Sequence, residues 1–240
     1  MLNTMLEALK PVLEELSQGQ SLMGILSNYA TDSLVRASCR IAFRYLSRQK
    51  DQGRDIAEKM ALASQFAQAD PYRAATHNKG IFNGIDAILI ATGNDWRAIE
   101  SGAHAFASRD GHYQSLSQWT LDLEREELVG QMTLPMPVAT KGGSIGLNPR
   151  VALSHELLGN PSAKELAQII VSIGLAQNFA ALKALVSTGI QQGHMKLQAK
   201  SLALLAGASE SEVAPLVERL IAEKTFNLET AQRYLENLRS

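Results

Sequence analysis

The chain has 240 residues, of which 45% are hydrophobic and 20% are charged, enough for one sizeable core with an appended subdomain. Its formal net charge of −1 excludes the global basic field that drives nucleic-acid binding. Cys39 is the single cysteine, which excludes intrachain disulfides, argues against a thiolate zinc site and makes a reducing, cytoplasmic setting the default expectation.

The first segment, Met1–Leu16, is predicted to be an amphipathic helix, because its apolar residues recur at three- and four-residue steps. Thr4 and Glu7 fit a capping box near its start. Its glutamates and the lack of a basic stretch before an apolar run argue against an export signal. No later segment is expected to approach the ~20 apolar residues that span a bilayer, so the chain should be soluble.

A sheet is expected because apolar and polar residues alternate from Val35 to Phe43, the period of a half-buried strand. The other strands are predicted at Ser21–Leu26, Trp119–Leu123 and Leu128–Leu134, the last two paired around the turn Glu124–Glu127. Ala87–Ala91 fits a buried strand, although periodicity also allows a buried helix end. Helices are predicted at Ile56–Phe66, from Pro71 onward and at Trp96–Phe106.

The chain from Ser162 onward is predicted to be helical, beginning with a capping box formed by Ser162 and Glu165. Before it, Pro135 to Pro149 is the longest irregular stretch, which suits a backbone path close to a ligand. The helical pattern is interrupted at Gly189–Gly193 and resumes in three segments, Met195–Leu205, Ser211–Glu223 and Leu228–Leu238. We therefore expect a boundary near Gly189, with a small all-helical unit beyond it.

The densest polar stretch, Asp70–Asp86, carries a candidate binding face. If it is a helix, Lys79 and Asn83 lie one turn apart on the same side, and small neighbours such as Gly80 and Gly84 let a ligand or backbone approach. A solvated helix face would give the same pattern, so composition leaves both interpretations open.

Three further positions are candidates on chemical grounds. Asp95 follows the apolar run, where ligand groups gather if that run is a strand, but spacing alone favours an N-cap. Gln177 and Asn178 interrupt an apolar helix with amides that need partners from the protein or a ligand. His194 is the third, because histidine is a residue type suited to proton transfer, although a lone linker histidine is more often incidental.

Metal and nucleotide motifs do not stand out in the sequence. No HExxH spacing is present, no GxGxxG follows a strand, and Gly142–Gly146 lacks the lysine of a phosphate-binding loop. No metal is therefore expected. The residues alone indicate a lysine, aspartate and histidine site for an anionic ligand.

Several segments, in this order, resemble 3-hydroxy-3-methylglutaryl-CoA (HMG-CoA) reductase: Asp70–Asp86, Ala91–Ala98, Gly102–His104, Gly111–Tyr113, Pro135–Pro137, Gly174–Asn178 and Gly189–Met195. Thr-His-Asn-Lys-Gly at Thr76–Gly80 is similar to the soluble class II enzymes. The resemblance implies an α+β fold, a mixed helix and sheet large domain with an all-helical C-terminal flap. Residues 1–30 would be a remnant of the small nicotinamide-binding domain, 31–188 the partial large domain and 189–240 the flap.

The same resemblance implies three catalytic roles. Lys79 would polarise the thioester carbonyl and stabilise the oxyanion as hydride arrives. Asp95 would hydrogen-bond and tune that lysine. His194, on a mobile flap, would protonate the departing CoA thiolate, and closure would exclude water.

The resemblance also implies four substrate-binding residues. Arg73 and Asn83 would hold the HMG carboxylate and neighbouring oxygens, for which a planar guanidinium is well suited. Asn28 and Gln177 would contact the substrate as well. The implied reaction is two hydride transfers from NADH or NADPH, without a metal, converting HMG-CoA through mevaldehyde to mevalonate and CoA in isoprenoid metabolism. A homo-oligomer with its active site at a dimer interface is implied, and neither nucleic acid nor membrane is an expected partner.

The sequence departs from the family in three places. The cofactor motif Asp-Ala-Met-Gly-Ala-Asn would lie just ahead of Asn3, the catalytic glutamate is absent, and Gln198 stands where many relatives have histidine. We therefore expect a C-terminal portion that is inactive alone, binds its cofactor mainly through the missing region and works with a separate N-terminal fragment. The alternative is a non-catalytic acyl-CoA-binding homologue or assembly subunit. A lysine Schiff-base lyase fits less well, because Asp95 would keep Lys79 protonated.

Overall fold

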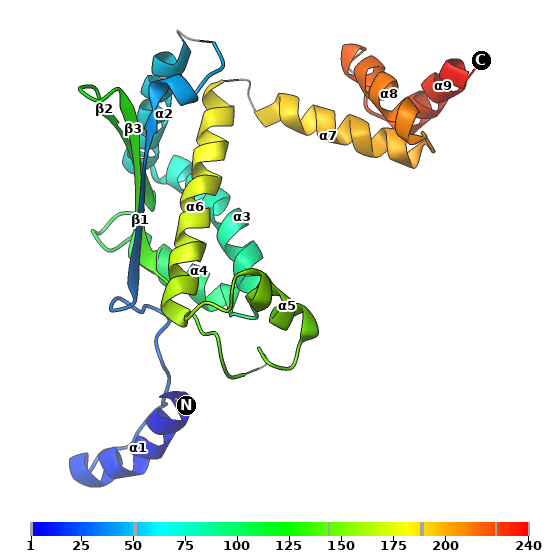
Figure 1. Cartoon of the computed structure of the whole chain (residues 1–240). Helices are drawn as coiled ribbons and strands as arrows, with labels where there is room; N and C mark the ends of the chain where they lie inside the picture. The colour runs from blue at the N-terminus through cyan, green and yellow to red at the C-terminus, as the bar shows by residue number, and fades with distance from the viewer. Residues whose placement is uncertain (1, 50–51, 144, 188–189, 224, 240) are drawn as a thin grey trace. The chain divides into compact units, whose positions relative to one another are not determined.

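The computed structural model describes residues 2–49, 52–143, 145–187, 190–223 and 225–239, without the side chains of residues 2 and 190–194. The chain separates into two compact units, Met1–Ala180 and Ala181–Ser240. Figure 1 shows the first as helices with a sheet and the second as helices. The three-part division at residues 30 and 188 stays a prediction, and Gly189 lies outside the described residues.

The sheet of the first unit contains three antiparallel strands, in the order β1 (Leu34–Ala42), β3 (Glu127–Pro135) and β2 (Ser117–Asp122). The register runs from Leu34 opposite Pro135 to Ala42 opposite Glu127, and β2 pairs with the other edge of β3. Side chains of β1 alternate between exposed and half-buried as the pattern predicts. All three of these strands were expected and are confirmed.

Helices pack against this sheet and form the core with it (Figure 1). They are α2 (Gln52–Ala69), α3 (Pro71–Ala91), α4 (Trp96–Ala107) and α6 (Ala163–Val186). Each lies where a helix was predicted, and α3 begins as expected, with Pro71 in its first turn and the Asp70 carboxylate accepting a hydrogen bond from the Tyr72 N–H. Fully buried side chains fill the space between the elements, among them Trp119, Leu134, Ile85 and Ile170.

Helix α6 contradicts the expectation that no segment is long and apolar enough to span a bilayer. By length and composition it is apolar enough to cross a membrane, although no segment of that kind was expected. Its face toward the rest of the unit buries Leu166, Ile170 and Leu175. Ser162 and Glu165 form the predicted capping box at its start. Core helices of soluble proteins meet the same criterion, so the property is weak evidence for a membrane span.

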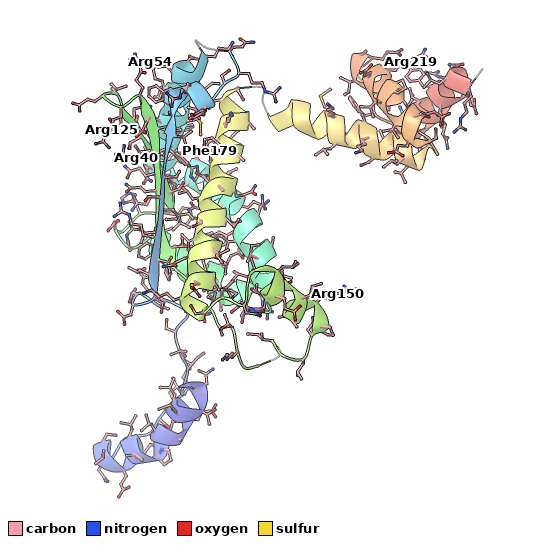
Figure 2. The ribbon with its side chains drawn as sticks, viewed as in Figure 1. Arg40, Arg54, Arg125, Arg150, Phe179 and Arg219 are labelled. Atoms are coloured by element: carbon pink, nitrogen blue, oxygen red, sulfur yellow. The ribbon has the colours of Figure 1, made fainter. Side chains whose placement is uncertain are left out.

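Close packing around Trp119 fixes the distance between the sheet and α6. The indole lies against Gly130 so tightly that an added Cβ there would come within 2.3–2.7 Å of ring atoms. The ring also meets Phe179 of α6 (labelled in Figure 2), with centroids 5.5 Å apart. A glycine in the middle of β3 is therefore required by the ring that crosses it.

The second unit is a small helical cluster with its own core. It contains α7 (Ile190–Leu205), α8 (Glu210–Ala222) and α9 (Leu228–Arg239), so the three predicted helices are confirmed. The predicted interruption at Gly189–Gly193 is wrong from Ile190 onward, because α7 begins there rather than at Met195. Leu216, Leu220 and Leu235 are buried between them. The Arg239 guanidinium binds both carboxylate oxygens of Glu212, so the end of α9 is held against the start of α8.

Three local predictions are wrong. Ser21–Leu26 is irregular, with Leu22 and Ile25 88% and 74% exposed, because no strand in the described part of the chain pairs with its backbone. Ala87–Ala91 is the last turn of α3, the alternative that periodicity had left open. Thr4 and Glu7 do not begin α1 (Leu2–Ser17), since that helix already runs from Leu2.

Two shorter elements complete the first unit. A 3-10 turn, η1 (Phe43–Tyr45), follows β1, and α5 (Pro149–Leu157) ends the irregular stretch that begins after β3. Asn148 caps α5 by accepting a hydrogen bond from the Arg150 N–H.

The Trp119 packing leads to a stability prediction. Gly130→Ala should lower the free energy of unfolding by roughly 1–3 kcal/mol, because overpacking forces the indole or the strand to move. Gly80→Ala is the matched control: its added Cβ meets nothing within 4 Å, and alanine in a helix should raise stability by up to about 1 kcal/mol. Urea denaturation followed by circular dichroism measures both. Equal effects of the two changes would contradict the packing argument.

Candidate functional site

The exposed face of α3 carries the predicted pair. Lys79 Nζ donates a hydrogen bond to Asn83 Oδ1 at 2.7 Å, and both side chains are exposed. The prediction that they lie one turn apart on one face is confirmed. Arg73, two turns earlier, is half-buried, and this burial lowers the pKa of its guanidinium below the usual value.

The opposite face of α3 is anchored by a buried polar network around Asn178 of α6. Asn178 Oδ1 accepts hydrogen bonds from Trp119 Nε1 at 2.8 Å and Ser117 Oγ at 2.9 Å. Its amide nitrogen lies 3.0 Å from His77 Nε2, which also contacts Ser117 Oγ at 2.6 Å. The buried amide predicted to need partners therefore finds them within the protein.

Asn78 forms a second anchor beside the first. Its side chain accepts from the Leu116 N–H and donates to the Gln114 carbonyl and the Tyr113 hydroxyl. Tyr113 in turn contacts His104 Nδ1 at 2.8 Å. His77 and Asn78 thus fix the helix on one side while Lys79, the next residue, points to solvent.

Asp95 is the N-cap of α4, as its spacing favoured. Its Oδ1 accepts hydrogen bonds from the Arg97 and Ala98 N–H groups at 3.1 and 3.2 Å. Within the described part of the chain it forms no ion pair with Lys79, and Arg97 Nε lies 3.8 Å from the same oxygen. The structure therefore does not bring the predicted lysine and aspartate together in this single chain.

The remaining predicted residues lie on three different elements. Gln177 packs on Gly84, one residue from Asn83, where an added Cβ would come 3.0 Å from the glutamine side chain. Asn28 is exposed, and its carbonyl oxygen approaches Gly102 so closely that a Cβ there would lie 2.4 Å away. His194 belongs to α7, but its side chain lies outside the described residues.

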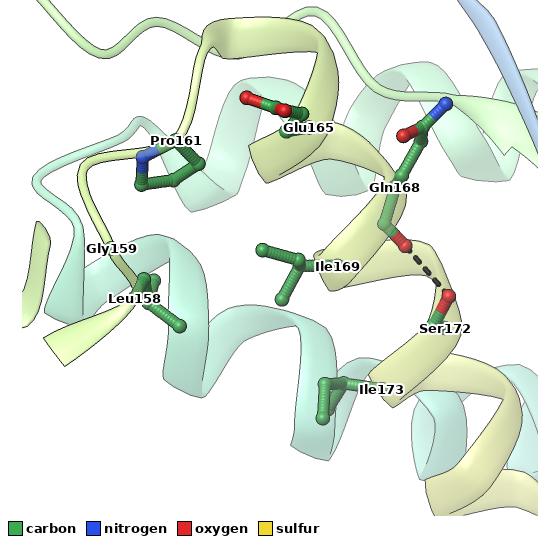
Figure 3. Close-up of a pocket in the computed structure, with 8 residues that line it drawn as sticks. All are labelled: Leu158, Gly159, Pro161, Glu165, Gln168, Ile169, Ser172 and Ile173. Atoms are coloured by element: carbon green, nitrogen blue, oxygen red, sulfur yellow. Dashed lines mark hydrogen bonds between the residues drawn. The ribbon is translucent and has the colours of Figure 1, made fainter.

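The hollow shown in Figure 3 does not contain any of these predicted residues. It has a volume of about 530 Å³ and lies between the end of α5 and the first half of α6. Its lining is Leu158, Gly159, Pro161, Glu165, Gln168, Ile169, Ser172 and Ile173. Among the described residues no group of three His, Cys, Asp or Glu side chains could hold a metal.

Sequence reasoning missed the role of Asn94. Its side chain accepts from the Ala139 N–H at 2.8 Å and donates to the Ala139 carbonyl at 3.1 Å, so it holds the irregular stretch after β3 against the end of α3. The preceding Gly93 has φ +72°, which directs the chain into this turn. The Gly-Asn pair after an apolar run is the signal that could have indicated such a turn.

Two titratable groups on α3 have strongly shifted pKa values. Burial, with the nearby charge of Arg73 as a second cause, lowers the pKa of His77 to about 4. Burial raises the pKa of Asp86 to about 6, with repulsion from Glu100 as a second cause. Asp86 Oδ1 is buried without a hydrogen-bond partner in the described part of the molecule. No spacing pattern in the sequence indicated either shift.

Comparison with known proteins identifies the family. The family model described as hydroxymethylglutaryl-coenzyme A reductase matches residues 1–199. The chain belongs to this family. The 3-hydroxy-3-methylglutaryl-coenzyme A reductase of Archaeoglobus fulgidus is 44% identical over 238 residues, which cover 99% of this chain and 53% of that protein. A probable reductase of this type from Borreliella burgdorferi is 39% identical over 184 residues, 76% of this chain and 42% of that protein.

Solved structures of the reductase from Streptococcus pneumoniae are similar in sequence and fold. One is 94% identical with a TM-score of 0.76 and covers 99% of this chain and 56% of that one. Another, the class II enzyme bound to NADPH in open conformations, is 94% identical with a TM-score of 0.75 and covers 100% and 58%. The predicted family and its α+β fold are confirmed. The chain spans about half the length of the relatives it matches.

The raised pKa of Asp86 predicts an unusual dependence of stability on pH. The folded chain prefers the protonated carboxyl, so the stability that protonation provides is lost as pH rises from about 4 to about 6. Asp86→Asn should therefore raise the free energy of unfolding near pH 7 by about 1 kcal/mol, after discounting for solvent screening, and change it little near pH 4. Urea denaturation at both pH values measures the difference.

Asp55→Asn provides the control for Asp86, because Asp55 pairs with Lys59 on an exposed helix face. The free energy of unfolding of Asp55→Asn should not exceed that of the unsubstituted chain near pH 7. A gain for Asp86→Asn that is the same at both pH values would contradict the titration argument.

Proposed function

We propose that this chain supplies the substrate-binding part and most catalytic side chains of an HMG-CoA reductase. The reaction would reduce HMG-CoA with a nicotinamide cofactor to mevalonate and CoA. The observation that carries the proposal is the Lys79–Asn83 pair, held on an exposed face of a helix whose other face is anchored in the core. Membership of the reductase family and the high identity to the Streptococcus pneumoniae enzyme support it.

Lys79 suits the stabilisation of a developing oxyanion. Its ammonium has three donors, of which one is used by Asn83 among the described residues, so two remain for a carbonyl oxygen. A preorganised cation of this kind acts where charge develops during hydride transfer to a thioester. Asn83 holds the lysine in place and keeps its own amide N–H groups for a neighbouring substrate oxygen.

Arg73 is the proposed partner of the substrate carboxylate. Its guanidinium is partly desolvated, a cost that a bound anion offsets, and its planar shape matches a carboxylate in a bidentate arrangement. Gln177 and Asn28 are proposed to complete the substrate side. The packing of Gln177 on Gly84 supports this assignment, because it places Gln177 close to Asn83.

The cap formed by Asp95 is compatible with the proposed catalytic role. The Arg97 and Ala98 N–H groups both donate to the Oδ1 of Asp95. Its Oδ2 has no hydrogen-bond partner among the described residues. That second oxygen would accept a hydrogen bond from the Lys79 ammonium in the complete enzyme and keep the lysine charged. His194 is proposed to protonate the departing CoA thiolate, because histidine is the residue that most often transfers protons in catalysis.

The cofactor is proposed to be NADPH, because the closely similar class II structure is described as bound to it. Its site would lie mainly in the part of the relatives that this chain does not span. Residues 1–30 would belong to that small domain, which fits the exposed apolar side chains of Leu9, Leu13 and Leu16 on α1. A cytoplasmic homo-oligomer with the site at a dimer interface completes the proposal.

The alternative is a homologue that binds acyl-CoA without catalysis, or an assembly subunit. It would keep Arg73 and Asn83 but would not need Lys79 and His194. The joint presence of Lys79, Asp95 and His194 favours the enzyme.

A reconstitution experiment tests the function. The chain alone should not oxidise NADPH with HMG-CoA, and adding the N-terminal half of the Streptococcus pneumoniae enzyme should restore oxidation, measured by NADPH absorbance. Lys79→Ala should lower the restored rate by about 10²–10³-fold, the typical loss for an oxyanion-stabilising group. Lys59→Ala, which breaks an exposed ion pair on α2, is the control and should leave the rate unchanged. Full activity in Lys79→Ala would overturn the assignment.

Two substitutions of Asp95 separate its cap from its proposed catalytic role. Asp95→Ser keeps a good N-cap, so stability should stay within roughly 0.5 kcal/mol, whereas Asp95→Ala should lose about 1 kcal/mol. Because serine lacks the carboxylate, the reconstituted rate of Asp95→Ser should still fall by more than about tenfold. Unchanged kinetics in Asp95→Ser would mean that Asp95 serves α4 alone.

A further inference from the structure

A polar cleft lies at the outer face of the sheet, beside the segment that connects α4 to β2. Its volume is about 500 Å³. Arg36 of β1 and Gln131 of β3 line it from the sheet, and Arg109 and Gln114 line it from the connecting segment. Lys79, Asn83 and Arg73 are not among its lining residues, so the proposed reductase chemistry does not explain it.

The lining of this cleft is positively charged. It contains two arginines and no acidic residue. Among the residues that the structure describes, Arg36 forms no ion pair, and its guanidinium donates to the neutral amide of Gln131 at 2.6 Å. Arg109 shares its charge with Asp110, whose Oδ2 lies 3.6 Å from Arg109 Nε. Arg109 also donates to the Phe106 carbonyl at 3.0 Å and lies over the Phe106 ring, 4.3 Å from its centroid. Two arginines therefore line the cleft with one carboxylate beside them.

The other lining groups are amides and hydroxyls held in fixed positions. Gln131 Nε2 donates to Gln118 Oε1 at 2.8 Å, which continues the chain of hydrogen bonds that starts at Arg36. On the far side, Gln68 Nε2 donates to the hydroxyl of the buried Ser115 at 2.7 Å. Such groups can donate and accept hydrogen bonds, as the hydroxyls of a polar ligand require.

We propose that this cleft binds a small phosphomonoester whose body carries hydroxyl groups, such as a sugar phosphate. A phosphate monoester carries a charge of about −1.5 to −2 near neutral pH, which matches two guanidiniums better than a single carboxylate does. Arginine binds phosphate oxygens in a bidentate way, and the glutamine and serine side chains pair with hydroxyls. The volume exceeds that of a phosphate ion and leaves space for such a body.

The test uses the whole chain and calorimetric titration at constant ionic strength. The probes are ribose 5-phosphate, ribose and inorganic phosphate. Ribose 5-phosphate should bind at least about tenfold more tightly than either ribose or phosphate, because it engages both sets of groups. Arg36→Gln and Arg109→Gln should each weaken its binding by about tenfold or more, since each removes one charge-assisted contact.

Arg40→Gln is the matched control. Arg40 (labelled in Figure 2) is also exposed on β1, on the same face as Arg36. Its guanidinium binds Asp122 and Glu127, and Arg40 is not among the lining residues of the cleft. It should leave binding unchanged, as should Lys79→Ala, which separates this result from failure of the proposed reductase function. Equal weakening by Arg40→Gln, or equal affinity for phosphate and ribose 5-phosphate, would overturn the proposal. Circular dichroism verifies that each variant is folded.

Discussion

The buried amide of Asn178 is the interaction on which the arrangement of the first unit depends. It joins α6 to β2 through Trp119 and Ser117, and to α3 through His77. A buried amide is costly unless it is satisfied, so these elements keep the relative positions in which all its partners are within reach. The face of α3 that carries Lys79 is oriented by the same contacts, because His77 and Lys79 are two positions apart on one helix.

Much of the fold could be predicted because its signals are local. The alternation in β1, the proline at the start of α3 and the Ser162–Glu165 capping box each determine one element without help from distant residues. The strand predicted at Ser21–Leu26 was wrong because a composition typical of strands does not form a strand without a pairing partner. The strand interpretation of Ala87–Ala91 was wrong because a short apolar run has no period of its own, and only its continuity with α3 shows that it is helical.

Of the candidate site, the sequence predicted one contact correctly but not the wider geometry. Helical spacing placed Lys79 beside Asn83, and the structure supplies the hydrogen bond between them. No spacing rule brings Asp95 to Lys79, since the two are separated by the turn at Gly93 and Asp95 is already engaged by the first turn of α4. The polar cleft at Arg36 and Arg109 was not visible in the sequence either, because its two arginines are far apart in the chain, one on β1 and the other in the segment between α4 and β2.

The two shifted groups on α3 make opposing contributions to acid tolerance. His77 stays neutral in the folded chain, so its contribution is complete above its ordinary pKa of 6.5 and is lost as pH falls toward about 4. Asp86 contributes in the reverse direction over nearly the same interval. Mild acidification therefore strengthens one part of α3 while it weakens another. Between about pH 4 and pH 6.5, the opposing titrations of an imidazole and a carboxyl thus partly cancel in the stability of the unit that presents Lys79.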